Sequence, residues 1–262
     1  YAGLLGMYYK LAINSKTPII FTLHTNKLDA VIRRLLLFLM RPLRKVDVIF
    51  SKGAKKWYLK NNAILPNGID FDALKITIER EYNTSETFSF LFLGRINPAK
   101  NPLYLVSVAK KLIAKDIRNF VINVVGDGNL SVDLKLEIER NNLEDYIILH
   151  GYQEVTKPFL EKTDCLILPS KREGMPMVIL EAAAANLPII STPVGSIPDF
   201  LNNSNAKIVD LDSFDLAMED IMKNYDVALL KSTKLLSDIS NEFDIDLVFR
   251  KHLNLYKSLT VK

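Results

Sequence analysis

The stretch LPSKREGMPMVILEAAAANLPIISTPVGSIPD, from Leu168 to Asp199, decides how this sequence folds, because an apolar run passes through a polar loop into a helix. It carries one carboxylate in the loop, Glu173, and another in the predicted helix of residues 178–185, Glu181. Glu181 lies about two turns beyond Glu173 at 3.6 residues per turn. One carboxylate can therefore face a ligand at the helix N-terminus while the other grips a more distant part of it.

A carboxylate accepts hydrogen bonds from two hydroxyl groups at once, which suits a ribose diol or a sugar. The alternative for Glu173 and Glu181 is an amphipathic helix whose Glu side chains are merely solvated. An isolated pair favours that alternative, so the neighbouring loops have to decide between the two interpretations.

A second strand, loop and helix lie upstream, in FSFLFLGRINPAKNPLYLVSVAKKL, residues 88–112. The apolar run ends at Gly94, and Pro102 is predicted in the first turn of the following helix. Arg95 and Lys100 lie in the loop between them. A guanidinium and an ammonium beside a helix N-terminus can hold a diphosphate, although both are also ordinary surface residues.

A third loop follows the apolar run in VINVVGDGNL, residues 121–130, and contains Gly126 and Gly128. Glycines let the backbone approach a ligand closely. This segment lacks the third glycine of a dinucleotide-binding fingerprint, so no dinucleotide site is predicted here. The sequence therefore supports two interpretations of Gly126 and Gly128, a tight strand-to-helix turn and a contact with a ligand.

The composition is that of a folded α/β protein, since 48% of the 262 residues are hydrophobic and 24% are charged. Apolar runs alternate with helical patterns and short Gly, Pro and Asn breaks, which predicts βαβ units and parallel sheets. The C-terminal part is expected to hold strands at 88–93, 121–125, 147–149, 165–168, 189–191 and 207–209. The N-terminal part is expected to hold strands at 18–23, 46–50 and 63–65, with helices at 4–13, 28–43 and 52–60.

Together these motifs resemble the retaining glycosyltransferases of the GT-B fold, specifically glycosyltransferase family 4, also called glycosyl transferases group 1. The resemblance is collinear along much of the chain. It rests on PNGID (66–70), GRINPAK (94–100), VGDG (125–128), LHGY (149–152), PSKREGMPMVILEAAA (169–184) and TPVGSIPDFL (192–201).

The resemblance implies an α/β protein with two Rossmann-like domains. Residues 1–84 would be an N-terminal, acceptor-side domain without its opening βα units. Residues 85–242 would be a complete, doubly wound donor-binding domain, and residues 243–262 a helix that packs back on the N-terminal domain.

A UDP- or GDP-linked sugar would bind mainly to the C-terminal domain by this resemblance. Arg95 and Lys100 would contact the diphosphate, Glu181 the ribose and Glu173 the donor sugar. The remaining donor-binding positions would be Gly94, Gly126, Gly174, Met175, Pro176 and Met177. His24, at the end of a predicted strand, matches an active-site histidine that faces the donor sugar, with a structural role as the alternative.

Two positions depart from the family's pattern. Met175-Pro176-Met177 replaces the aromatic or Gly-Leu pair that often follows Glu-Gly, so the sequence does not predict which sugar is bound. Asp199 stands where the family has a Glu, and a helix cap is the alternative to a functional role.

The implied activity is retaining hexosyl transfer to a glycan or lipid-linked acceptor, in surface polysaccharide or glycolipid synthesis. The alternative is a catalytically inactive nucleotide-sugar-binding remnant or partner subunit. Three His and one Cys without clustered spacing predict no metal site and no cofactor besides the donor. The lone Cys165 argues for a reducing, cytoplasmic location.

Charge is distributed unevenly, since residues 1–84 hold 14 Lys and Arg against 6 Asp and Glu, a net charge of +8. Much of the excess flanks the apolar core of residues 35–40, within the predicted helical region 28–45. A basic, apolar helix of this length cannot span a bilayer but can lie on the inner face of the membrane. The alternative is a Rossmann helix buried on one side with basic ends. Nucleic acid is not expected, because aromatic residues do not interleave with the basic ones.

Overall fold

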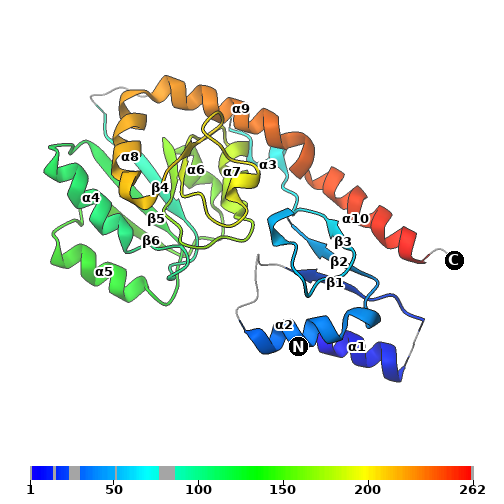
Figure 1. The fold of residues 1–262 in the computed structure, drawn as a ribbon. Coiled ribbons are helices and arrows are strands. Elements are labelled where there is room, and N and C mark those ends of the chain that lie inside the picture. Colours follow the sequence, from blue (N-terminus) through cyan, green and yellow to red (C-terminus); the bar gives the residue numbers. More distant parts are fainter. Residues whose placement is uncertain (1, 14–15, 24–29, 51, 77–85, 261–262) are drawn as a thin grey trace. The chain divides into compact units, whose positions relative to one another are not determined.

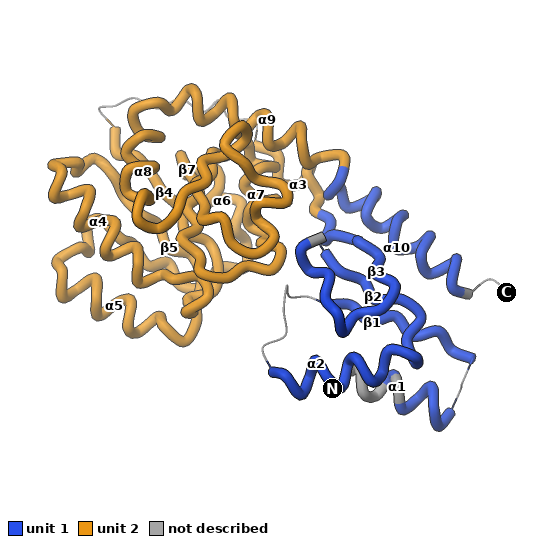
Figure 2. Tube along the Cα trace, viewed as in Figure 1, with its two compact units in different colours: residues 1–68, 242–262 blue, residues 69–241 orange. Residues whose placement is uncertain are grey.

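The computed structural model describes residues 2–13, 16–23, 30–50, 52–76 and 86–260. They form two compact units, residues 1–68 together with 242–262 and residues 69–241 (Figure 2). The predicted boundary at residues 84 and 85 falls outside the described residues, so the predicted domain limits stay a prediction. Each unit is described by itself below.

The second unit is built on a parallel sheet with the strand order β6-β5-β4-β7-β8-β9 (Figure 1). Each predicted strand of this part is confirmed to within two residues. The strands are β4 (Phe88–Leu93), β5 (Phe120–Val125), β6 (Ile147–Gly151), β7 (Cys165–Leu168), β8 (Ile189–Ser191) and β9 (Lys207–Ile208). From β4 the chain proceeds outward to β6, then returns and adds β7 to β9 on the other side. The order therefore reverses between β4 and β7, which is the switch point of a doubly wound sheet.

Both faces of this sheet are buried, which explains why its strands read as continuous apolar runs. In β4 the rings of Phe88, Phe90 and Phe92 point into one core cluster, and they are almost completely inaccessible to solvent. Leu91 and Leu93 alternate with them and are buried on the opposite face, as the two-residue period of a strand requires.

The helices of the second unit lie between consecutive strands or follow the last one. They are α3 (Phe71–Leu74), α4 (Tyr104–Ala114), α5 (Ser131–Arg140), α6 (Lys157–Glu161), α7 (Met177–Ala184), α8 (Phe214–Lys223) and α9 (Tyr225–Phe243). Side chains from α4, α5 and α8 complete the core cluster that contains the β4 phenylalanines. The loops that enter α4 and α7 follow the two strands at the switch point.

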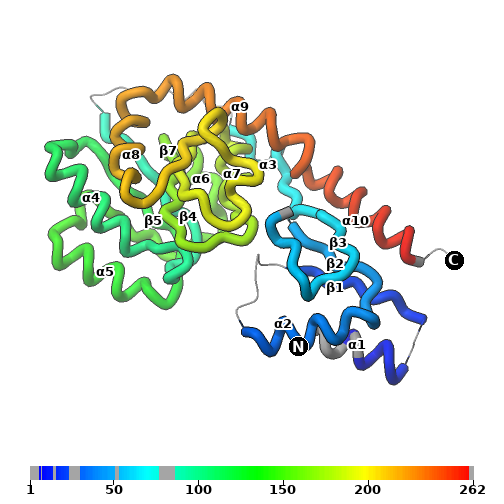
Figure 3. The backbone as a smooth tube through the Cα atoms, viewed as in Figure 1, coloured from blue at the N-terminus to red at the C-terminus, as the bar shows by residue number. Residues whose placement is uncertain are grey.

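The first unit contains a parallel sheet of order β1-β2-β3 among the described residues. Its elements are α1 (Ala2–Ala12), β1 (Ile20–Leu23), α2 (Val31–Leu39), β2 (Val46–Ile49), β3 (Asn62–Ile64) and α10 (Ile245–Thr260). The C-terminal helix α10, red in Figure 3, packs against the turn after β3. A Cβ on Gly68 would lie 2.7 Å from the Cα of Ile245, so only glycine fits there without displacing the helix.

The predicted helix at residues 52–60 is wrong. Only a short 3-10 turn forms, at Lys52–Ala54. Peptide groups near the end of the segment bond to the side chains of Arg44 and Asp47 instead of forming a helix. The Lys60 N–H donates to the Asp47 carboxylate at 2.6 Å, and the Tyr58 carbonyl accepts from Arg44 at 3.0 Å. These tertiary hydrogen bonds outweigh the helical pattern of the sequence.

Candidate functional site

The loops that follow β4, β5 and β6 are held together by their backbones. Gly94 N–H donates to the Val125 carbonyl at 3.0 Å, and Gly126 N–H donates to the Gly151 carbonyl at 2.8 Å. Gly94 and Gly126 have φ values of 150° and 141°, a region that favours glycine. A Cβ on Gly126 would lie only 1.9 Å from the Gly94 carbonyl oxygen. Gly126 is therefore needed for packing between the loops, and a contact of either glycine with the donor stays a prediction.

Lys100 and Glu173 meet directly at the switch point, although 72 residues separate them in the chain. The Lys100 ammonium lies 2.7 Å from Oε1 and 2.8 Å from Oε2 of the Glu173 carboxylate. Glu173 is only 9% exposed. Loss of either Lys100 or Glu173 would leave the other charge buried without its partner, which is costly.

A third residue, Ser170, holds the same carboxylate. Its hydroxyl donates to Glu173 Oε1 at 2.7 Å, and Ser170 itself is buried. Thr192 donates in turn to the Ser170 carbonyl at 2.6 Å. The Glu173 carboxylate is thus fixed from the β7 side as well as by Lys100.

Backbone and amide hydrogen bonds tie the Lys100 loop to the Glu173 loop. The Asn101 side-chain amide donates to the Pro169 carbonyl at 3.1 Å, and the Lys171 N–H donates to the Ala99 carbonyl at 2.8 Å. Asn101 has a positive φ of 58°, which Asn adopts more readily than most residues. Helix α4 begins at Tyr104, so Pro102 lies in the preceding turn and not in the first helical turn as predicted.

Sequence reasoning missed both Asn101 and Ser170. An Asn just before a helix and a Ser just after a strand are common in turns and caps, so neither gave a signal. Their importance comes from contacts across the two loops.

Arg95 does not join the Lys100 and Glu173 pair. Its neighbour Ile96 is 2% exposed and anchors the loop, whereas the Arg95 side chain lies in solvent. Within the described part of the chain it forms no hydrogen bond or ion pair. Its guanidinium is therefore available to a ligand, and its role on a diphosphate stays a prediction.

Glu181 lies on α7, which is buried on nearly all sides and is not the amphipathic helix considered above. The buried residues of α7 are Val178, Ile179, Leu180, Ala182, Ala183 and Ala184. Because α7 starts at Met177, Glu181 lies little more than one turn into the helix. A solvated surface Glu is excluded by these surroundings.

Burial raises the pKa of the Glu181 carboxyl above its ordinary value. Among the described residues no side chain or backbone group forms a hydrogen bond or ion pair with this carboxylate. A half-buried carboxylate in that condition is costly for the fold and has its acceptor oxygens free for hydroxyl donors.

The loop before α7 is closed from the β8 side. The Ser196 hydroxyl donates to the Gly174 carbonyl, and Pro176 is the residue that precedes the helix. Met175 and Met177 are partly exposed beside it. Asp199 is exposed in the short 3-10 helix Ile197–Asp199 and does not cap its N-terminus, which is at Ser196.

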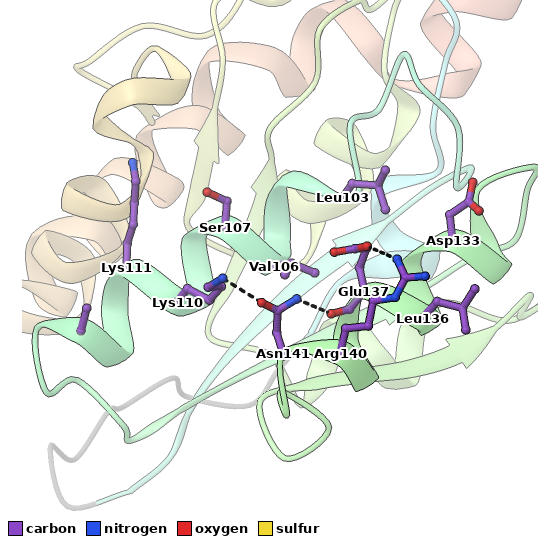
Figure 4. Close-up of a pocket in the computed structure, with 11 residues that line it drawn as sticks. Leu103, Val106, Ser107, Lys110, Lys111, Asp133, Leu136, Glu137, Arg140 and Asn141 are labelled. Carbon is purple, nitrogen blue, oxygen red and sulfur yellow. Dashed lines mark hydrogen bonds and ion pairs between the residues drawn. The ribbon is translucent and has the colours of Figure 1, made fainter.

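A cavity of about 850 Å³ lies elsewhere, between α4 and α5 (Figure 4). None of the described residues predicted for the site lines it. Four of its polar side chains bond to one another, since Lys110 donates to Asn141 at 2.7 Å and Arg140 pairs with Glu137 at 2.8 Å. This cavity has no feature of a nucleotide site, and the ion-paired loops at the switch point are the better candidate.

His24 lies outside the described residues, so its predicted role is not tested. In the parts of the chain that the structure describes, no group of three or more His, Cys, Asp or Glu side chains is placed to hold a metal ion.

Sequence comparisons find a matching family and similar proteins. The family model described as "Glycosyl transferases group 1" matches residues 87–224, more than half of the chain. UDP-Gal:alpha-D-GlcNAc-diphosphoundecaprenol alpha-1,3-galactosyltransferase of Escherichia coli is 30% identical over 211 residues, which cover 76% of this chain and 54% of that protein. Poly(ribitol-phosphate) alpha-N-acetylglucosaminyltransferase of Staphylococcus aureus is 26% identical over 172 residues, 63% of this chain and 34% of that protein. The chain thus spans about half or less of the length of these relatives.

Solved structures share the fold at low sequence identity. Anabaena HepE in complex with UDP and glucose has a TM-score of 0.83 at 14% identity, over 97% of this chain and 75% of that one. S. aureus TarM, in complex with fondaparinux, alpha-GlcNAc-glycerol and UDP, has a TM-score of 0.80 at 16% identity, over 96% of this chain and 53% of that one. The predicted fold class is confirmed. With its doubly wound second unit and the match over residues 87–224, the chain belongs to the glycosyl transferases group 1 family and has the GT-B fold.

Proposed function

We propose that this chain binds a UDP- or GDP-linked sugar and acts as a retaining, metal-independent hexosyltransferase in surface glycan synthesis. The acceptor would be a lipid-linked or polymeric glycan. The observation that carries the proposal is the Lys100 and Glu173 ion pair, buttressed by Ser170, at the switch point where doubly wound sheets bind ligands.

The chemistry needs positive charge beside the leaving group. The bond between the sugar C1 and a diphosphate oxygen breaks, and its electron pair stays on the diphosphate. The acceptor oxygen forms the new bond to C1, and its proton passes to the departing diphosphate. Lys100 and the solvent-accessible Arg95 supply cations for the diphosphate, which lowers the barrier by electrostatic stabilisation.

Donor binding would rearrange the ion pair. The Lys100 ammonium would turn from Glu173 to the diphosphate, and the released carboxylate would accept hydrogen bonds from the sugar hydroxyls. Ser170 keeps its hydrogen bond to Oε1 during this exchange, so Glu173 retains its orientation when Lys100 leaves. The ribose diol would bind Glu181, whose acceptor oxygens have no partner in the described structure.

The relatives and the solved structures support this choice of ligand. The E. coli relative is named for UDP-Gal and a diphosphoundecaprenol-linked acceptor, and the HepE and TarM structures hold UDP. The retaining stereochemistry, the hexosyl group and the independence from metal come from the family resemblance. His24 is proposed to face the donor sugar on the same basis.

The test is calorimetric titration of UDP and GDP into the purified chain and its variants. Lys100→Gln should weaken UDP binding about 10- to 100-fold, because a charge-assisted hydrogen bond contributes roughly 1.5–3 kcal/mol. Lys110→Gln is the matched control, since Lys110 is an exposed lysine on α4 that bonds only to Asn141 in the described structure. Its affinity for UDP should be unchanged. Equal affinity of the Lys100→Gln variant and the original chain would contradict the proposed site.

A transfer assay then separates the two functional alternatives. The substrates are UDP-galactose and GlcNAc-diphosphoundecaprenol, those named for the E. coli relative, alongside other UDP- and GDP-hexoses. Transfer that fails in Lys100→Gln supports the enzyme. Nucleotide binding without transfer from any donor tested would instead favour the inactive nucleotide-sugar-binding subunit.

A further inference from the structure

The Lys100 and Glu173 ion pair occupies the carboxylate that is proposed above to bind the donor sugar. The ammonium contacts both oxygens, Oε1 at 2.7 Å and Oε2 at 2.8 Å, and the Ser170 hydroxyl also donates to Oε1. The Glu173 side chain is only 4% exposed. A neutral sugar hydroxyl lacks the positive charge of the ammonium, so it is the weaker ligand for this carboxylate. A sugar can therefore bind to Glu173 only after Lys100 has moved.

The lysine is the partner that can move. Its side chain is 16% exposed, against 4% for Glu173, and its ammonium ends a flexible four-carbon stem. The backbone of Lys100 is held independently of the ammonium, because its N–H donates to Asn97 Oδ1 at 3.1 Å. The next residue, Asn101, donates to the Pro169 carbonyl and ties the same loop to the end of β7. The loop can thus stay in place while the Lys100 ammonium changes its partner.

Gly94 leaves room beside the lysine stem. A Cβ on Gly94 would lie 3.8 Å from Cε of Lys100, so the stem passes over this glycine in van der Waals contact. Gly94 has a φ of 150°, which a residue with a side chain rarely adopts. The stem therefore has space on the side of the β4 loop, which also carries the exposed Arg95. That loop is where the diphosphate is proposed to bind.

We propose that Lys100 and Glu173 form a latch, in which the ammonium keeps the sugar-binding carboxylate occupied until a diphosphate draws it away. This regulation rests on the proposed function of the same site. A free sugar brings no charge and leaves the latch closed, whereas a diphosphate competes with Glu173 for the ammonium. Recognition of the sugar thereby becomes conditional on the diphosphate of the same donor, which selects nucleotide-linked sugars over free ones.

The latch lowers the affinity for a nucleotide without a sugar, because UDP has to break the ion pair and gains no sugar contact in return. Weakening the hold of Glu173 on Lys100 should therefore strengthen UDP binding. Glu173→Gln keeps the size of the side chain and an acceptor oxygen for Ser170, and it removes the charge that holds the ammonium. UDP should bind this variant about tenfold more tightly in calorimetric titration. Uridine, which has no phosphate, should bind the variant and the original chain equally.

A second variant separates the contact from simple repulsion between two negative charges. Glu173→Asp keeps the charge and withdraws the carboxylate by roughly one carbon–carbon bond, about 1.5 Å. The latch predicts that this variant also binds UDP more tightly, by about threefold, because the ammonium is held less firmly. Repulsion through space predicts no gain, since the negative charge is still present.

The matched control is Glu137→Gln, which makes the same change of charge on α5, where Glu137 pairs with Arg140 at 2.8 Å. Its affinity for UDP should equal that of the original chain. Circular dichroism melts establish that each variant is folded, and Glu173→Asp tests the latch even if Glu173→Gln does not fold. A crystal structure with UDP gives the direct observation, in which the Lys100 ammonium should contact a phosphate oxygen and no longer Glu173.

The latch is wrong if Glu173→Asp binds UDP no more tightly than the original chain, because repulsion would then account for any gain with Glu173→Gln. It is also wrong if the ion pair persists in the structure with UDP bound. Failure of the proposed function is a different result, namely unchanged UDP affinity in Lys100→Gln. Weakened binding in Lys100→Gln without a gain in Glu173→Asp contradicts the latch alone.

Discussion

Helices α7 and α2 are similarly apolar and have opposite surroundings. Helix α7, MVILEAAA, is buried along most of its length and carries one carboxylate, Glu181. Helix α2, VIRRLLLFL, has no buried residue in the described structure and turns its apolar side chains to solvent. In α7 the half-buried carboxylate without a partner among the described residues points to a ligand, since a local rule broken without compensation within the fold is expected at functional sites. The carboxylate of α7 suits ribose hydroxyls.

The first unit also has tightly buried side chains, although α2 is exposed. The largest predicted effect tests one such buried pair. Arg44 and Asp47 form a buried ion pair at 3.1 Å in the first unit. Burial raises the pKa of the Asp47 carboxyl and lowers that of the Arg44 guanidinium. Asp47→Ala should destabilise the first unit by roughly 3–5 kcal/mol, because it leaves Arg44 buried without its counter-charge.

Trp57 lies in the first unit, so its fluorescence during urea unfolding measures this loss. Lys45→Ala is the control in the same unit, because Lys45 is exposed and its substitution should change the free energy of unfolding by no more than about 0.5 kcal/mol. A Trp57 unfolding midpoint unchanged by Asp47→Ala would show that the pair adds nothing to the first unit.

The second prediction compares the two helices directly through one substitution. Leu180 of α7 is completely buried, and Leu39 of α2 is 69% exposed. Leu180→Ala should lower the free energy of unfolding by about 2–5 kcal/mol, because it removes packing and leaves a cavity. Leu39→Ala should change it by no more than about 0.5 kcal/mol. Denaturation followed by circular dichroism tests both, and a large loss with Leu39→Ala would show that α2 is packed against the protein.

The smallest predicted effect concerns the stability cost of Glu181. Because burial raises its pKa in the folded protein, folding disfavours the ionised carboxylate. The cost is absent below the ordinary pKa of 4.5 and is complete once the pH exceeds the raised value. Glu181→Gln should therefore raise Tm by up to a few degrees at pH 7, at about 2–4 °C per kcal/mol, and not at pH 4.

Thermal melts from pH 4 to 8 measure this difference, and UDP titration of the same variant should show weakened binding. A higher Tm together with lower affinity is the signature of a residue kept for function. A lower Tm at pH 7 would show that Glu181 makes a stabilising contact and would weaken its assignment to ribose.

Much of the second unit was predictable because its strands are short apolar runs that end at Gly94, Gly126 or Pro169. The same reasoning gave a wrong helix at residues 52–60, where Asp47 and Arg44 take the peptide groups that a helix would use. It also left open, as the alternative to ligand binding, an amphipathic helix at residues 178–185 with a solvated Glu181, and the burial of α7 excludes that alternative. Sequence patterns reflect local conformational preference. The structure of residues 52–60 and the burial of α7 depend instead on contacts with other parts of the fold.

The sequence by itself determined the parallel sheet of the second unit, the family, and the two loops on which Lys100 and Glu173 lie. Hydrophobic periodicity and glycine or proline breaks are local, so they can be read along the chain. Only the tertiary structure decided that these two side chains pair, that Ser170 and Asn101 hold the loops, and that α2 faces solvent. Each of these depends on residues distant in sequence, whose approach follows from how the sheet is wound and from what packs against it.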